Sequence, residues 1–139
     1  MIQLRQQIDL DAPPDAVYAA WLQFERFPEF MEGVREVRVV GDELHWRAEF
    51  GGRSVEWTSA ITVQIPCHRI AWRVLAGTTA SGAVTIGKAD EGRTRVTMEM
   101  RYDPAGPWGE AAVLERRIAG DLARFRALIE TRVRFPAAP

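Results

Sequence analysis

The sequence has very little of what disulfide bonds, metal sites and reactive thiols are built from. It contains one cysteine, Cys67, and two histidines, His45 and His68, among 139 residues. A single cysteine forms no internal disulfide, so a reducing compartment is permitted. Strand alternation places His45 on a solvent-facing side, and His68 follows Pro66 and Cys67 in a turn. We therefore expect neither a metal site nor a Cys–His nucleophile.

Lysine is almost absent, and the basic residues form no block. Lys88 is the one lysine among 18 basic residues, and arginines alternate with acidic residues, as in Glu115-Arg116-Arg117, giving a net charge of -1. Nucleic acid is therefore not an expected partner. No apolar run approaches the length of a membrane span, and the first residues lack the apolar core of a signal peptide. These features predict a cytoplasmic protein without stable membrane insertion.

The N-terminal region predicts a strand followed by two short helical segments. Residues 2–11 alternate between apolar and polar side chains, which is typical of a half-buried strand. Pro14 suits the first turn of a helix, because its missing N–H would be unpaired there. We expect a helix from about Pro14 to Phe24, then a short second helix or tight loop over residues 25–33, ending at Gly33.

From Val34 to Asp103 the sequence predicts a meander of antiparallel strands, because short runs rich in Val, Ile, Thr and Trp are separated by turn signals. Several runs alternate, so one face of the sheet should be apolar and the other wet. A register slip of one residue would reverse the faces and expose three tryptophans together, which disfavours it. The longest run predicts an inward face made of Val55, Trp57, Ser59, Ile61, Val63 and Ile65.

The C-terminal quarter predicts one long helix. From about Gly109 to Arg134, large apolar residues recur at helical spacing, and Arg and Glu occupy the opposite side. The predicted buried stripe consists of Leu114, Ile118, Leu122, Phe125, Leu128, Ile129 and Val133.

One helix covers a large sheet incompletely. A helix is about 10 Å wide, whereas six or seven strands span roughly 30 Å. The sheet must therefore curl around the helix, and a space left between them suits an apolar ligand. The sequence as a whole predicts an α+β fold in one domain, residues 1–139. It is a curved antiparallel sheet of six to seven strands around the long C-terminal helix, with two short helices after the first strand.

Five segments carry a resemblance to a known family: DAPPDAVY at 11–18, FPEFM at 27–31, HWRA at 45–48, RIAWR at 69–73 and GDLARF at 120–125. Together with the order of elements, they resemble the helix-grip fold of the START/Bet v 1-like superfamily and, within it, the polyketide cyclase/dehydrase branch. The resemblance covers essentially the whole chain. It implies an internal site for a lipid, quinone or polyketide, with enzymatic activity in some members.

The resemblance is incomplete at one strand. Polyketide aromatase/cyclases line the pocket with alternating Trp, Ser and Arg, and the Arg steers the growing poly-β-ketone. Here Trp57 and Ser59 resemble the first two residues, whereas Ile61 stands at the third position. The cation that would polarise a carbonyl is missing, which argues against authentic aromatase activity.

The candidate ligand-binding residues are the large side chains expected to face the cavity. Indole rings offer a flat surface to a planar ligand, and methionines adapt to ligands of several shapes. Ordinary core packing explains the same residues, because the walls of a pocket are also core. The predicted set is Trp21, Phe27, Phe30, Met31, Trp46, Trp57, Ser59, Trp72, Met98, Met100, Ile118, Leu122 and Phe125.

Catalysis of polyketide cyclisation needs an acid to polarise a carbonyl and a base to remove an α-proton. Ser59 and Tyr102 are the inward-facing polar candidates: Ser59 would orient a ligand carbonyl, and Tyr102 would act as a weak acid. The structural alternatives are a local hydrogen bond for Ser59 and a hydroxyl that reaches solvent for Tyr102. We expect no metal and no cofactor.

Three functions therefore stay open. The first is an enzyme that cyclises and dehydrates a polyketide. The second is a carrier or chaperone, monomeric or homodimeric, whose partner is an apolar small molecule such as a lipid, quinone or polyketide. The third is a protein–protein adaptor, which predicts a filled core and an exposed apolar patch. A buried charge near Ser59 would favour the enzyme, and a wholly apolar lining would favour the carrier.

Overall fold

The computed structural model describes residues 1–136. Its elements in chain order are β1 (Ile2–Leu10), α1 (Pro14–Trp21), the 3₁₀ helix η1 (Phe24–Glu29), β2 (Val34–Val40), β3 (Glu43–Phe50), β4 (Arg53–Ile65), β5 (Arg69–Val74), β6 (Ala80–Lys88), the 3₁₀ helix η2 (Asp90–Gly92), β7 (Thr94–Tyr102) and α2 (Ala111–Arg134). This order confirms the predicted strand, helical pair, six-stranded meander and long helix.

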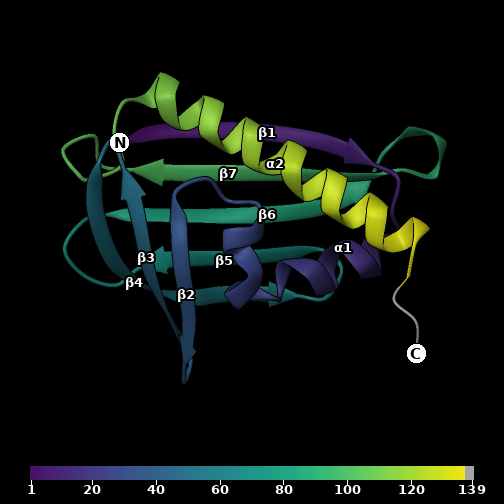
Figure 1. The fold of residues 1–139 in the computed structure, drawn as a ribbon, viewed down its shortest axis with the longest axis horizontal. Coiled ribbons are helices and arrows are strands. Elements are labelled where there is room, and N and C mark those ends of the chain that lie inside the picture. Colours follow the sequence, from purple (N-terminus) through teal and green to yellow (C-terminus); the bar gives the residue numbers. More distant parts are fainter. Residues whose placement is uncertain (137–139) are drawn as a thin grey trace.

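The seven strands form one antiparallel sheet in the order β1-β7-β6-β5-β4-β3-β2. Neighbours from β2 to β7 are consecutive in the chain, so short hairpin connections suffice. Figure 1 shows β2 and β3 turned steeply away from the direction of β6 and β7, while α2 crosses one face of the sheet. The curved sheet around a long helix is thus confirmed.

The first helix is shorter than the sequence predicts. It ends at Trp21, and the chain turns there into η1, so the predicted end at Phe24 was wrong by about one turn. The N–H of Leu22 donates to the carbonyl of Ala19, a bond of the 3₁₀ type that tightens the last turn. The tighter geometry turns Phe27 inward, where its side chain is buried.

A β-bulge in β4 reverses the predicted faces of its last residues. Ile61 pairs with Trp72, but the next pair is Val63 with Ala71, so one extra residue lies in β4. Because side chains alternate with a period of two, the extra residue moves Val63 and Ile65 to the outer face. Their predicted inward orientation was therefore wrong, and Ile65 is 47% exposed.

The helix α2 buries its apolar stripe against the sheet. The predicted stripe is confirmed over most of its length, and it fails at Val133, which is 44% exposed near the end of the helix. The buried members are Leu114, Ile118, Leu122, Phe125 and Ile129.

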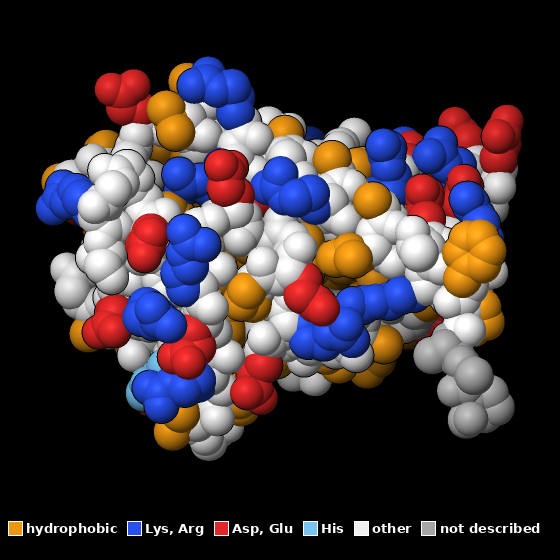
Figure 2. Space-filling view, viewed as in Figure 1, with side chains coloured by type: hydrophobic (Ala, Val, Ile, Leu, Met, Phe, Trp, Pro, Cys, Tyr) orange, Lys and Arg blue, Asp and Glu red, His pale blue; other side chains and the backbone are white. Residues whose placement is uncertain are grey.

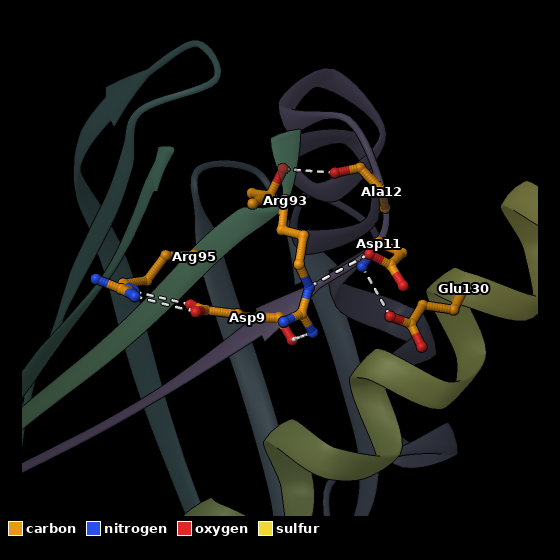
Figure 3. A network of polar contacts seen from close by, with 7 residues as sticks. Asp9, Asp11, Ala12, Arg93, Arg95 and Glu130 are labelled. Atoms are coloured by element: carbon orange, nitrogen blue, oxygen red, sulfur yellow. Dashed lines mark hydrogen bonds and ion pairs between the residues drawn. The ribbon is translucent and has the colours of Figure 1, made fainter. Parts of the chain in front are cut away.

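A polar network joins β1, β7 and the second half of α2 (Figure 3). Arg95 binds both carboxylate oxygens of Asp9, at 2.7 Å and 3.0 Å. Arg93 pairs with Asp11 at 3.3 Å, and the N–H of Asp11 donates to Glu130 at 2.7 Å. The hydrogen bond from the Arg95 guanidinium holds the pKa of Asp9 below its ordinary value. These charged residues are thus paired with one another and serve the fold.

The face that carries α2 is mixed in charge. Figure 2 shows Lys and Arg side chains intermingled with Asp and Glu, and apolar side chains between them. Within residues 1–136, no helix is both long enough and apolar enough to cross a membrane.

Candidate functional site

An apolar cleft lies between the helical segment α1–η1 and the concave face of the sheet. Its volume is about 30 Å³, which is room for about two water molecules. All ten side chains that line it are apolar. They are Trp21, Phe24, Phe27 and Met31 on the helical side, and Leu44, Trp46, Ile61, Ile70, Trp72 and Val84 on the sheet.

Phe27 joins the helical side of the apolar cleft to the sheet. Its ring centroid lies 5.7 Å from that of Trp21 and 5.6 Å from that of Phe24, both edge to face, and 5.8 Å from that of Trp46. Such aromatic contacts contribute beyond the area that they bury. The helical side of the cleft, which we call its roof, is therefore held to the sheet through the ring of Phe27.

Two side chains of α2 form hydrogen bonds with the backbone of residues 30–32, which follow the roof in the chain. Asp121 accepts a hydrogen bond from the N–H of Glu32 at 2.8 Å, and Arg124 Nε donates to the carbonyl of Phe30 at 2.9 Å. Arg124 also pairs with Asp121. Gly33 comes next, at φ +82°, and a Cβ there would lie 2.6 Å from the carbonyl oxygen of Glu49, so only glycine fits. We call Asp121 and Arg124 the clasp.

The clasp contains a carboxyl group that titrates near neutral pH. The side chain of Asp121 is 13% exposed, and burial raises its pKa from 3.8 to about 6. The hydrogen bonds from Glu32 and Arg124 and the charge of Arg117 act in the opposite direction, and burial outweighs them.

The sheet wall of the cleft is braced by a stacked pair of indoles. Trp46 and Trp57 pair across β3 and β4, with ring centroids 5.3 Å apart and planes within 11°. Trp46 Nε1 donates to the hydroxyl of Ser59 at 2.9 Å, and Ser59 is fully buried. The hydroxyl of Ser59 therefore accepts a local hydrogen bond, and this bond stabilises the sheet wall of the cleft.

The stack continues toward the hairpin between β3 and β4. Trp57 stacks on Phe50 at 6.1 Å, and the Arg117 guanidinium carbon lies 4.2 Å from the centre of the Phe50 ring. Trp108, from the loop before α2, meets Trp57 edge to face at 4.9 Å and is buried. Aromatic packing thus extends from α1 to the N-terminal half of α2.

Tyr102 lies apart from Ser59. Three strand spacings separate β7 from β4 in the sheet order, or about 14 Å along the hydrogen-bonding direction. The Tyr102 hydroxyl is buried and has no hydrogen-bond partner among residues 1–136. Burial, with a smaller contribution from the charge of Glu115, raises the pKa of Tyr102. The two candidate catalytic groups thus come from strands that are not neighbours in the sheet.

The structure divides the predicted binding residues into three groups. Five line the apolar cleft: Trp21, Phe27, Met31, Trp46 and Trp72. Phe30, Met98, Ile118, Leu122 and Phe125 lie in the buried core, and Met100 is packed against it. Trp57 and Ser59 support the sheet wall from behind Trp46. A role in binding stays a prediction for all of them.

Five lining residues lie outside the predicted set: Phe24, Leu44, Ile61, Ile70 and Val84. The signal was present for three of them: alternation placed Ile61 on the inward face, and the runs that hold Leu44 and Ile70 alternate in the same way. Phe24 was assigned to the end of the first helix, although it begins η1. Val84 belongs to β6, whose sequence alternates less clearly.

Wider hollows on the molecule are more open to solvent, and charged side chains take part in their lining. One groove of about 590 Å³ is bordered by Arg53, Glu56, Trp57 and the loops around Gly77 and Gly106. Within residues 1–136, no three His, Cys, Asp or Glu side chains are grouped so that they would hold a metal ion. The apolar cleft differs from these hollows in its wholly apolar lining, and it borders both the sheet and the helical segment.

A family described as polyketide cyclase/dehydrase and lipid transport matches residues 10–126. An uncharacterized 17.2 kDa protein of Streptomyces lincolnensis is 33% identical over 138 residues, which cover 95% of this chain and 92% of that protein. Both matches extend over the helical segment, the sheet and most of α2.

Solved structures share the fold. The Zhui aromatase/cyclase from Streptomyces sp. R1128 superposes with a TM-score of 0.82 at 20% identity, covering 99% of each chain. A START superfamily protein from Mycobacterium smegmatis superposes with a TM-score of 0.73 at 12% identity, covering 95% of this chain and 97% of that one. At these identities the likeness establishes the helix-grip architecture.

Proposed function

Because the chain belongs to the polyketide cyclase/dehydrase and lipid transport family, we propose that it binds a planar apolar small molecule of the polyketide class in the apolar cleft. The observation that carries the proposal is the lining of the cleft, which is apolar at all ten positions. Such a surface selects a ligand by shape and by desolvation. The proposal includes a cytoplasmic location, one domain over residues 1–139, and a monomer or homodimer as the working unit.

The lining favours a carrier over an enzyme. Cyclisation needs a proton donor and acceptor beside the substrate, and the ten lining side chains supply neither. Ser59 is committed to Trp46. The observation that favours the enzyme is Tyr102, a buried phenol whose hydroxyl has no partner among residues 1–136 and whose raised pKa keeps it a neutral donor.

The adaptor function is supported least. The small cleft, about 30 Å³, comes near the filled core that an adaptor predicts, so the evidence against this function lies on the surface. The most exposed large apolar side chains among residues 1–136 come from separate elements: Met1 before β1, Val39 and Val40 on β2, Ile65 on β4, and Val113, Val133 and Phe135 on or just after α2.

The first test is binding of prodan, a planar naphthalene dye whose emission rises in apolar surroundings. We expect saturable binding to the wild-type chain at one site. Ile61→Glu places a charge in the apolar lining and should weaken binding by at least about tenfold. Ile65→Glu makes the same change on the same strand, at an exposed position, and should leave binding unchanged.

Circular dichroism melts would verify that both variants fold. Equal binding by Ile61→Glu and Ile65→Glu would place the dye outside the apolar cleft and contradict the proposal.

The enzymatic alternative has its own test. The chain is incubated with a linear poly-β-ketone, and loss of water on ring closure is followed by mass spectrometry. A carrier should leave the rate at its value in buffer. Acceleration that Tyr102→Phe abolishes, while Tyr18→Phe on α1 does not, would replace the carrier by the enzyme.

A further inference from the structure

Trp72 differs from the other four tryptophans of the chain. Trp21, Trp46, Trp57 and Trp108 each contact another aromatic ring, at centroid distances of 4.6 to 5.3 Å. Trp72 has no aromatic neighbour and no hydrogen bond among residues 1–136, and it is partly exposed although it lines the apolar cleft. Van der Waals contacts alone hold its indole in place, so the ring moves at lower cost than the others.

Because Gly82 has no side chain, the indole of Trp72 can pack directly against the sheet at that position. The two residues face each other across β5 and β6. A Cβ on Gly82 would lie 2.5 Å from Cζ2 and 2.8 Å from Cε2 of Trp72. The six-membered ring therefore lies directly against the bare backbone, which a side chain at position 82 would prevent. Glycine inside a strand marks a site where another group approaches the backbone closely.

The indole of Trp72 forms part of the sheet wall of the apolar cleft. On the helical side the cleft is bordered by Phe24, Phe27 and Met31, and the remaining volume is about 30 Å³. That volume admits about two water molecules and no aromatic ring. The indole of Trp72 itself occupies a position against Gly82 that accommodates an aromatic ring.

We propose that Trp72 is a movable gate, and that the ring of the ligand takes the place of its indole against Gly82. The indole swings toward solvent, and the planar fused ring then lies between the glycine backbone and the apolar roof. The ligand class is therefore planar, apolar and at least as large as an indole, and Trp72 determines the accepted size. This inference rests on the proposed function in one respect, that the ligand enters the apolar cleft.

The gate has a consequence for affinity. When the binding-competent conformation is a minor one, the observed affinity falls by its population. If the indole is open one-tenth of the time, Trp72→Ala removes that cost and strengthens prodan binding about tenfold. The same change should raise the association rate constant, because binding no longer waits for the indole to move.

The test combines three variants, prodan titration and stopped-flow fluorescence. Trp72→Ala should bind prodan about tenfold more tightly, with a faster association rate. Gly82→Ala puts a methyl group into the ring's place and should weaken binding by at least about tenfold. Gly87→Ala is the matched control on the same strand, because nothing lies within 4 Å of a Cβ there, and its binding should equal that of the wild type.

Other results would contradict the gate, the proposed function or the ligand class, and each can be told apart from the others. If Ile61→Glu abolishes prodan binding but Trp72→Ala and Gly82→Ala leave affinity and rate unchanged, the cleft is the site and the gate is wrong. If the folded Trp72→Ala variant loses prodan binding, the indole is a wall that holds the dye, and the gate is wrong while binding in the cleft stands. If the wild type itself binds no prodan, the gate and the proposed function fall together. Stronger binding of the acyl-chain probe cis-parinaric acid than of prodan by Trp72→Ala would overturn the planar ligand class.

Discussion

The two halves of the concave face differ in how completely they are filled. Under α2, Leu122 and Phe125 are 1% exposed, and the Phe125 ring lies 4.6 Å from that of Trp21. Under α1–η1, Trp46 and Trp72 are partly exposed and border a cleft. A close-packed interior loses stability when any group is removed, whereas residues beside free space can adjust. One apolar face is thus completely filled in one half and borders free space in the other.

The largest expected effect is in the filled half. Phe125→Ala removes a ring that packs between Trp21 and Phe30, at centroid distances of 4.6 Å and 5.2 Å. We expect the free energy of unfolding, measured by urea denaturation, to fall by about 3 to 5 kcal/mol.

Phe24→Ala is the matched change in the half that holds the cleft. Its ring is partly exposed and lines the cleft, so the loss should stay below about 2 kcal/mol. Equal losses for the two variants would mean that the halves are packed alike, and the comparison would fail.

The clasp connects the two halves, and its contribution to the free energy of unfolding depends on pH. The folded-state pKa of Asp121 is about 6, above its ordinary value of 3.8. Protons thus bind more tightly to the folded chain, so the stability that this group contributes is fully present below pH 3.8 and is lost as pH rises to about 6. Asp121→Asn removes that loss and keeps an acceptor for Glu32. Above pH 6 it should be more stable than the wild type by about 1 to 3 kcal/mol.

The measurement is urea denaturation of the wild type and Asp121→Asn between pH 4 and pH 8, roughly the window of the linkage effect. The difference should shrink toward pH 4, where Asp121 is protonated in the folded state and, with its ordinary pKa of 3.8, about half protonated in the unfolded state. Asp42→Asn, in the exposed turn between β2 and β3, is the control. If the free energies of unfolding of the two proteins differ by the same amount at every pH from 4 to 8, roughly the window of the linkage effect, Asp121 ionises as an ordinary surface carboxyl group.

The spacing of apolar residues in the sequence correctly predicted which residues are buried in the half under α2. The spacing of Leu114, Ile118, Leu122 and Phe125 follows the helix, so the sequence alone shows which face is buried. Alternation likewise placed Trp46 and Ser59 on the inward face of the sheet. These signals are local, and each element carries its own.

The half that holds the cleft depends on pairings that no local pattern contains. The bulge after Ile61 lies in a run without glycine or proline, so nothing in the sequence indicated that Ile65 would turn outward. Trp72, which lines the cleft, lies against Gly82 because of the register between β5 and β6. The clasp needs α2 to meet a loop 89 residues earlier in the chain.

The smallest expected effect lies at the wall between the two halves. Ser59→Ala removes the acceptor of the Trp46 indole N–H, and the free energy of unfolding should fall by about 1 kcal/mol. The Trp46 indole proton should also exchange faster with deuterium, whereas Ser54→Ala, at an exposed position of β4, should change neither quantity. A loss as large as that of Phe125→Ala would mean that the Trp46–Trp57 wall belongs to the filled core. A small loss with a loosened indole would mean that the wall, like Trp72, belongs to the half that adjusts to a ligand.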